Sequence, residues 1–203
     1  MLSEIDAEIF RYLNTNFHFE PLNTLFIILT SRKYTIIPAV ILIFFLFKIY
    51  KKKGFWIFLG IVATAGLADF ISSGIMKKIF MRPRPCQTLE GIFFWSKKVD
   101  PPWLITDFSV KESYKSSFSF PSSHAANSMA VAVFTSFYLR KWTPFLIIVS
   151  LLIGYSRIHL GVHYPSDIIA GFMVGAICGF FVKYSFEIIY EYLDNRKKRS
   201  SEL

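Results

Sequence analysis

The chain has 203 residues, of which 53% are hydrophobic and only 18% are charged, and its formal net charge is +9. Soluble domains usually carry about 25% charged residues, so this balance excludes an ordinary soluble globule as well as a disordered chain. The two cysteines exclude a disulfide scaffold and a cysteine-rich zinc module. The basic residues form short clusters between long apolar runs, which is typical of a multi-pass membrane protein and not of a nucleic-acid-binding domain.

A short amphipathic helix is predicted at the start of the chain, before the first long apolar run. Ile5, Ile9 and Leu13 repeat at helical spacing, and Ser3 with Asp6 resembles a capping box. We expect this helix to lie at the membrane surface.

Six apolar runs predict six transmembrane helices. They cover residues 22–30, 36–48, 55–80, 125–139, 144–156 and 168–186. A helix needs about 20 residues to cross a bilayer, and each run reaches or approaches this length once its flanks are included. The first run is the weakest, because it needs the preceding residues to reach the interface. The expected fold class is therefore all-α, an integral membrane bundle of six helices that forms a single domain over residues 1–203.

Three basic clusters predict how the bundle is oriented. They lie at residues 51–53, 140–141 and 196–199. With six spans, these clusters share one side with the N-terminus, and the positive-inside rule makes that side cytoplasmic. A small chain without extra domains is typical of a bacterial protein. We therefore expect a multi-pass protein of the bacterial inner membrane with both termini in the cytoplasm.

A ladder of small residues is predicted to pack closely within the bundle. Gly171, Gly175 and Gly179 recur every fourth residue on the last span, which lets another helix backbone approach. We expect the partner to be a neighbouring span of the same chain. A homodimer seam is the alternative.

Polar residues gather at the ends of the spans in three groups. They are Lys77 with residues 81–85, residues 120–124, and Ser156 and Arg157 with His163 and Asp167. By the order of the spans, all three groups lie on the non-cytoplasmic face. Their shared membrane level predicts one site on the periplasmic or extracellular side.

The charges of these groups indicate an anion site. Lys77, Arg84 and Arg157 place three cations at one depth, which is costly near a bilayer unless an anion binds. Arginine suits phosphate, because its fork donates two parallel hydrogen bonds. Helix N-termini are expected at residues 121–123 and 165–166, where free backbone N–H groups also favour an anion.

Two histidines supply the reactive groups. His163 and Asp167 are four residues apart around a helix start, so the carboxylate can orient the imidazole and leave its other nitrogen free to attack. His124, at the start of another helix, can protonate a leaving oxygen. With the cations, these groups indicate phosphoryl transfer. No metal or other cofactor is expected, because the cations already neutralise the phosphate.

Each motif also has a plainer interpretation. An Arg-Pro-Arg-Pro segment is usually a basic juxtamembrane loop, and a Pro-Ser-Ser-His segment is usually a helix cap. His159 and His163 have the spacing of a zinc pair, but Gly161 and Pro165 interrupt the helix between and after them. We therefore expect His159 to be structural.

Taken together, the motifs resemble the three-part signature of the type 2 phosphatidic acid phosphatase (PAP2) superfamily. The matching segments are Lys77-x6-Arg84-Pro85, Pro121-Ser122-Ser123-His124 and Ser156-Arg157-x5-His163-x3-Asp167, with Ser123 where glycine is frequent. The resemblance implies that His163 is a nucleophile that forms a phosphohistidine and that Asp167 orients it. It implies that His124 protonates the leaving group and later activates water. It also implies six phosphate-binding residues: Lys77, Arg84, Arg157, Ser122, Ser123 and Ser156.

The resemblance leaves the substrate open, because these motifs recognise the phosphate and not the rest of the molecule. The loop at 86–120 is rich in aromatic residues and lysines, which fits contact with lipid headgroups and equally a loop that only rests on the interface. We expect a lipid phosphate in the bilayer as substrate and no nucleic-acid partner. Undecaprenyl diphosphate or lipid A is favoured, followed by phosphatidylglycerol phosphate or phosphatidic acid.

Two other functions fit the same scaffold less well. A non-catalytic lipid-phosphate binding or transport protein is the main alternative, and the intact His124, His163 and Asp167 weigh against it. Vanadate haloperoxidases have a similar pocket but are larger and soluble. The oligomeric state is left open.

Overall fold

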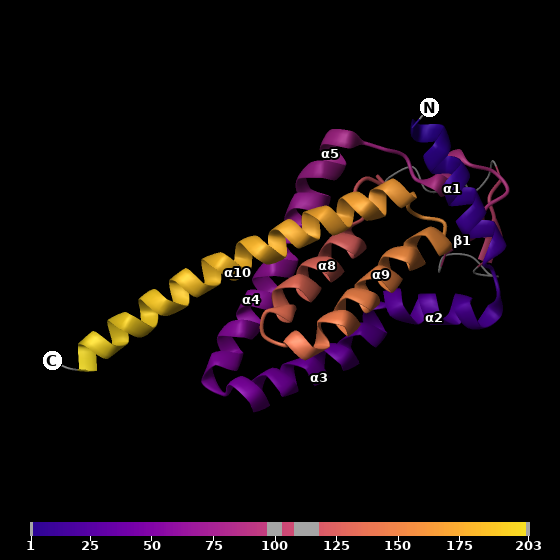
Figure 1. Ribbon diagram of the computed structural model, residues 1–203. Helices are drawn as coiled ribbons and strands as arrows, with labels where there is room; N and C mark the ends of the chain where they lie inside the picture. Colours follow the sequence, from indigo (N-terminus) through magenta and orange to yellow (C-terminus); the bar gives the residue numbers. More distant parts are fainter. Residues whose placement is uncertain (1, 97–102, 108–117, 202–203) are drawn as a thin grey trace.

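The computed structural model describes residues 2–96, 103–107 and 118–201, which form a bundle of helices (Figure 1). The α-helices are α1 (Leu2–Asn16), α2 (Glu20–Thr30), α3 (Arg32–Tyr50), α4 (Lys52–Asp69), α5 (Lys77–Phe80), α6 (Pro85–Thr88), α8 (Ser123–Ser136), α9 (Thr143–His159) and α10 (Pro165–Ser201). A π-helical segment, η1 (Phe70–Met76), joins α4 to α5, and a 3-10 turn, η2 (Arg140–Trp142), precedes α9. Strands β1 (Phe93–Trp95) and β2 (Trp103–Ile105) add a short antiparallel ribbon to the otherwise helical fold.

Several helices have the length and composition of membrane spans. Among the described residues, Lys52–Thr88, Arg140–His159 and Pro165–Leu193 are long and apolar enough to cross a bilayer, and Glu20–Thr30 and Ile36–Tyr50 are shorter apolar helices. On α10 the large apolar side chains of Met173, Ile177 and Phe181 are each more than 60% exposed, as expected of a surface that contacts acyl chains. The chain is a membrane protein.

The first two predicted spans do not fold back on each other. Asn23 of α2 is bonded to His159, the last residue of α9, which lies at the end of the bundle near α1. Tyr50, the last residue of α3, donates to the carbonyl of Tyr138 in the α8–α9 turn, which lies at the opposite end of the bundle. The two helices follow each other through Ser31 (Figure 1). With only 11 residues, α2 is about 16 Å long, too short to cross alone. Where the sequence predicted two crossings, the structure has a single passage through the bundle.

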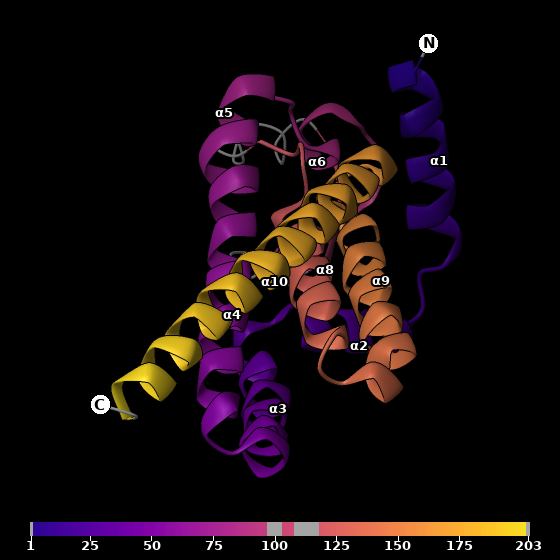
Figure 2. The same cartoon turned by 60° about the vertical axis from the view of Figure 1, so that its left-hand side comes forward.

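This path separates the two termini. Figure 2 shows the α3–α4 turn, the α8–α9 turn and the C-terminus at one end of the bundle, and α5, α6 and the N-terminus at the other. The three basic clusters therefore share one end, as predicted. The expectation that the N-terminus shares that end is wrong, because α2 and α3 make one passage instead of two and Asp6 is bonded to Arg82 at the opposite end.

The cap predicted for the N-terminal helix is not present in α1. The helix begins at Leu2, so Ser3 lies inside it and does not cap it. Asp6, Phe10 and Asn14 are buried, whereas nearly half of the Ile5 side chain is exposed. The amide of Asn14 is bonded to main-chain groups of β1 and of the end of α9, which fixes the helix across this end of the bundle.

The glycine ladder packs α10 against α8 within the chain, so this prediction is confirmed. A methyl group added to Gly175 would overlap the backbone oxygen of Ala126, and Gly171 and Gly179 meet other parts of the same helix. The two helix axes can approach closely only because these side chains are absent. The ladder brings the start of α10 next to the start of α8.

Replacing one of these glycines tests the packing. Gly175→Ala is expected to lower the free energy of unfolding by about 1–3 kcal/mol, since the added methyl group overlaps backbone atoms. The matched control is Gly66→Ala on α4, where nothing lies within 4 Å of the added carbon. Thermal unfolding in detergent should show a lower Tm for the first variant only. Equal Tm values would contradict the close approach.

Candidate active site

The three motif segments meet at the end of the bundle opposite the basic clusters. The N–H of Ser119, just before the second motif, donates to the carbonyl of Arg82 in the first, at 2.8 Å. The N–H of Ser122 donates to the carbonyl of Asp167 in the third, at 3.0 Å. These main-chain hydrogen bonds join segments that are far apart in the sequence, as the sequence analysis predicted.

The local geometry agrees with the helix boundaries inferred from the sequence. The predicted helix starts are confirmed, because α8 begins at Ser123 behind the N-cap Ser122, and α10 begins at Pro165. The helix that carries the start of the first motif, α5, ends at Phe80, and α6 begins at Pro85 with Arg84 as its N-cap. The prolines thus turn Arg84 out of the helix, as predicted.

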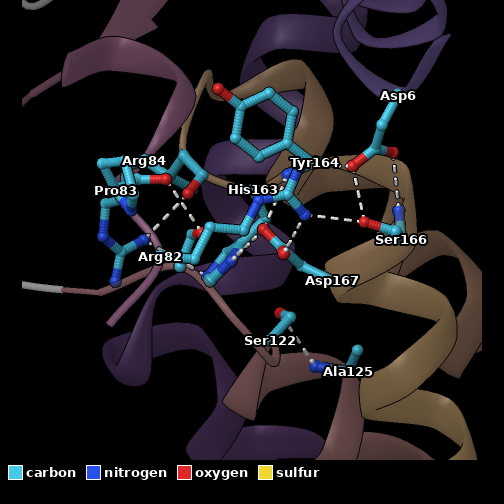
Figure 3. Close-up of polar contacts among 12 residues, drawn as sticks. Asp6, Arg82, Pro83, Arg84, Ser122, Ala125, His163, Tyr164, Ser166 and Asp167 are labelled. Carbon is cyan, nitrogen blue, oxygen red and sulfur yellow. Dashed lines mark hydrogen bonds and ion pairs between the residues drawn. The ribbon is translucent and has the colours of Figure 1, made fainter. Parts of the chain in front are cut away.

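His163 lies in the short segment between α9 and α10 and is almost completely buried, with a side-chain exposure of 2%. Its Nε2 lies 3.2 Å from Nη1 of Arg84, and its Nδ1 lies 3.4 Å from Oδ2 of Asp167 (Figure 3). Arginine has no acceptor atom, so Nε2 must accept the hydrogen bond, and the ring proton of the neutral form is on Nδ1. The lone pair of Nε2 therefore points away from Asp167 and toward Arg84.

The electrostatic surroundings keep this imidazole neutral. Burial lowers the pKa of His163 well below its ordinary value, and the positive charges of Arg84, Arg157 and Lys77 lower it further. The three predicted cations therefore converge on His163, together with a smaller effect of His124, which is exposed in the first turn of α8. A neutral imidazole with a free lone pair is the nucleophilic form.

Two of the cations have capacity left for an anion. In the part of the chain that the structure describes, Nε of Arg157 is buried without a hydrogen-bond partner. Lys77 is half-buried at the start of α5. Over the same described residues, no carboxylate lies within ion-pair distance of either side chain. A buried guanidinium N–H without a partner is costly, and a bound phosphate oxygen would satisfy it.

The three predicted serines already have partners in the protein. Ser122 accepts from the N–H of Ala125, Ser123 shares a 2.6 Å hydrogen bond with Ser73, and Ser156 donates to the carbonyl of Ile153. Their contribution to phosphate binding stays a prediction.

Asp167 is held by groups that the sequence did not assign to it. Oδ1 accepts from Nη1 of Arg82 at 2.8 Å, and Oδ2 accepts from the N–H of Tyr164 at 2.9 Å. Arg82 is paired in turn with Asp6 at 2.6 Å, and Asp6 also accepts from Ser166 (Figure 3). The sequence did indicate that Arg82 lies near the site, since it is part of the Arg-Pro-Arg-Pro segment. Nothing in the sequence linked Asp6 to the site, because it is 76 residues away from Arg82.

His159 occupies a separate place. Its Nε2 is bonded to Asn23 at 2.7 Å, and its ring stacks on His18 with the centroids 4.4 Å apart. These contacts join α2 to the end of α9. They agree with the structural role expected of His159.

The aromatic loop is described only in part. Phe94 of β1 is buried with Cys86, Leu160 and Val162, so the ribbon packs under the site segment. The lysines and other residues at 97–102 and 108–117 that suggested headgroup contact lie outside the described residues. Among the residues that are described, no group of three or more His, Cys, Asp or Glu side chains is arranged to hold a metal ion.

Comparison with known proteins adds the family. The model of the PAP2 superfamily matches residues 54–190, which include all the predicted site residues. A lipid A 4'-phosphatase of Porphyromonas gingivalis is 32% identical over 187 residues, which are 88% of this chain and 72% of that protein. An undecaprenyl-diphosphatase of Sulfolobus acidocaldarius is 29% identical over 178 residues, which are 86% of this chain and 75% of that protein.

A solved structure shows the same fold. The transmembrane PAP2 type phosphatidylglycerolphosphate phosphatase from Bacillus subtilis superposes with a TM-score of 0.63 over 93% of this chain and 87% of that chain. Its sequence identity is 23%, so this likeness concerns the fold. With the match to the family model, these findings make the protein a phosphate hydrolase, and the chain belongs to the PAP2 superfamily.

Proposed function

We propose that this protein is a metal-independent lipid phosphatase that removes phosphate from a membrane lipid phosphate or diphosphate through a phosphohistidine on His163. One observation carries the proposal. The Nε2 lone pair of a buried, neutral imidazole faces Arg84, and Lys77 and Arg157 lie near enough to lower its pKa. A nucleophile surrounded by cations suits a phosphate ester.

Substrate binding would change the partner of Arg84. A phosphate oxygen accepts from Nη1 of Arg84 more strongly than the imidazole does, because the pair is charge-assisted. Arg157 and Lys77 take further phosphate oxygens. Released from Arg84, Nε2 then lies beside the phosphorus.

In the first step, Nε2 of His163 attacks phosphorus and the bond from phosphorus to the leaving oxygen breaks. Protonated His124 gives its proton to that oxygen, so the lipid product leaves neutral at this atom. The imidazole keeps its Nδ1 proton and becomes cationic in the phosphohistidine. The carboxylate of Asp167, 3.4 Å away, stabilises this charge.

In the second step, neutral His124 takes a proton from water, and the water oxygen attacks phosphorus. The bond from phosphorus to Nε2 breaks and returns the electron pair to the nitrogen. Inorganic phosphate leaves and His124 is protonated again, so the cycle closes without a metal or another cofactor.

The surroundings of the site support a lipid substrate. The site lies at one end of an apolar bundle, where we expect lipid headgroups, and the basic clusters lie at the other end (Figure 2). The positive-inside rule then makes the site periplasmic or extracellular in a bacterial inner membrane, with the C-terminus cytoplasmic and the N-terminal residues on the side of the site. The names of the two relatives favour lipid A or undecaprenyl diphosphate as substrate.

Phosphate release from defined lipids tests the proposal. The purified protein in detergent with EDTA is expected to release phosphate from undecaprenyl diphosphate or lipid A faster than from phosphatidylglycerol phosphate or phosphatidic acid. His163→Gln should abolish release, and His18→Gln, which alters a histidine in the remote ring stack, should preserve it. A rate that EDTA abolishes and a divalent ion restores would contradict the metal-independent mechanism. Binding without release from any lipid would favour the non-catalytic alternative.

The covalent intermediate has its own test. With a radiolabelled nitrophenyl phosphate, whose leaving group is stable as an anion and needs no proton, His124→Gln should still label the protein, but dephosphorylation should slow about 100- to 10,000-fold because the base is absent. The label should be acid-labile and should be missing in His163→Gln. Rapid quenching followed by filtration measures it. Label retained in His163→Gln would assign the nucleophile elsewhere.

The lowered pKa of His163 predicts how its ring titrates. A lowered pKa leaves the neutral form in place as the pH falls, so the ring should still be neutral at about pH 6.5, where an ordinary histidine is half charged. NMR of histidine labelled at its ring nitrogens should show a protonated Nδ1 and a bare Nε2 at this pH. Half-protonation near pH 6.5 would contradict the inferred environment, and a neutral ring with its proton on Nε2 would contradict the tautomer.

A further inference from the structure

The guanidinium of Arg82 is held by three hydrogen bonds within the protein. Nη1 donates to Oγ of Ser166 at 2.7 Å and to Oδ1 of Asp167 at 2.8 Å, and Nη2 donates to Oδ2 of Asp6 at 2.6 Å. Its flat face lies 4.0 Å from the ring centroid of Tyr164. These contacts direct both terminal nitrogens of Arg82 toward Asp6, Ser166 and Asp167, whereas Nη1 of Arg84 points to Nε2 of His163.

Arg82 holds Asp167 in one orientation. The carboxylate of Asp167 is completely buried, and each oxygen has one strong donor, Arg82 on Oδ1 and the N–H of Tyr164 on Oδ2. With both oxygens fixed, Oδ2 is the atom that faces Nδ1 of His163. If Arg82 is removed, the buried carboxylate loses its counter-charge and can rotate.

Asp6 holds Arg82 from a different part of the chain. Its Oδ2 pairs with Arg82, and its Oδ1 accepts from the N–H of Ser166 at 3.0 Å, so the carboxylate bridges the first and third motifs. Phe10, one turn further along α1, packs edge-on against Tyr164 with the ring centroids 5.6 Å apart. Asp6 lies outside the residues 54–190 that match the family model.

We propose that Asp6 and Arg82 are positioning residues, which form a charge-alternating chain from Asp6 through Arg82 to Asp167 and thereby hold the carboxylate that orients His163. The N-terminal helix is then part of the catalytic unit. This inference rests on the proposed role of His163 as nucleophile. Neither positioning residue touches the phosphate, so both act on turnover and not on substrate affinity.

Kinetics on the preferred lipid phosphate test the chain of contacts. Arg82→Gln is expected to lower kcat about 10- to 100-fold and Asp6→Asn about 3- to 10-fold, each with KM nearly unchanged. The double variant should be no slower than Arg82→Gln alone, because Asp6 acts through Arg82. An unchanged kcat in Arg82→Gln, or a multiplicative loss in the double variant, would overturn the proposal.

A matched variant separates this role from simple attachment of the helix. Arg11, on the same helix, donates to the carbonyl of Glu90 at 2.7 Å and is not bonded to Asp6 or Arg82. Arg11→Gln should therefore loosen α1 without lowering kcat. If Arg11→Gln and Asp6→Asn slow turnover equally, α1 merely has to be attached and Asp6 has no specific role.

A spectroscopic measurement on the resting protein does not depend on turnover. The Nδ1 signal of His163 reports its contact with Asp167, so it should shift in Arg82→Gln and in Asp6→Asn but not in Arg11→Gln. An Nδ1 signal that is the same in all four proteins would refute the positioning role even where the substrate is unknown. If the wild type hydrolyses no lipid but the Nδ1 signal of His163 shifts as expected, the proposed function is wrong. The positioning role of Asp6 and Arg82 is then still supported.

Discussion

The buried carboxylate of Asp167 is the constraint on which the site depends. It has no exposed surface, and a charge in such a place must be paired and hydrogen-bonded. Asp167 contacts all three motifs. One carboxylate oxygen pairs with Arg82 of the first motif, and the other accepts from the N–H of Tyr164, next to His163 in the third motif. The main-chain oxygen of Asp167 accepts from the N–H of Ser122 in the second motif. The hydrogen bonds of Asp167 therefore hold together the segments that contain the catalytic residues, and they determine the direction in which the imidazole points.

Close helix packing makes that arrangement possible. The glycine face of α10 lets its backbone approach α8, so the N-terminal ends of the two helices lie beside each other at the site. Both ends favour an anion, and the cations from α5, the α6 cap and α9 surround the same point. Because burial and these charges keep His163 neutral, the positive surroundings that bind a phosphate also maintain the nucleophile in its reactive form.

The N-terminal helix α1 joins this end of the bundle by polar contacts as well as by the buried side chain of Phe10. Asn14 satisfies main-chain groups of β1 and α9, and Asp6 satisfies Arg82. The family model begins at residue 54, yet the hydrogen bonds of the site extend to residue 6. Through these contacts α1 and α2 stay on the side of the site, and the chain reaches the opposite end along α3.

Local signals in the sequence were sufficient to identify the helix starts behind Ser122 and at Pro165 and the glycine face of α10. Each of these depends on residues a few positions apart, where geometry follows from helical spacing and capping. The motif residues that converge on His163 were identified from the order of the spans, which places them at one membrane level, and from the resemblance to the PAP2 signature. The partners of Asp167, the buried side of α1 and the single passage of α2 and α3 had no such signal. They depend on contacts such as the one between Asp6 and Arg82, 76 residues apart. Only the tertiary structure decides them, because the energy of an ion pair depends on separation in space, which sequence distance does not determine.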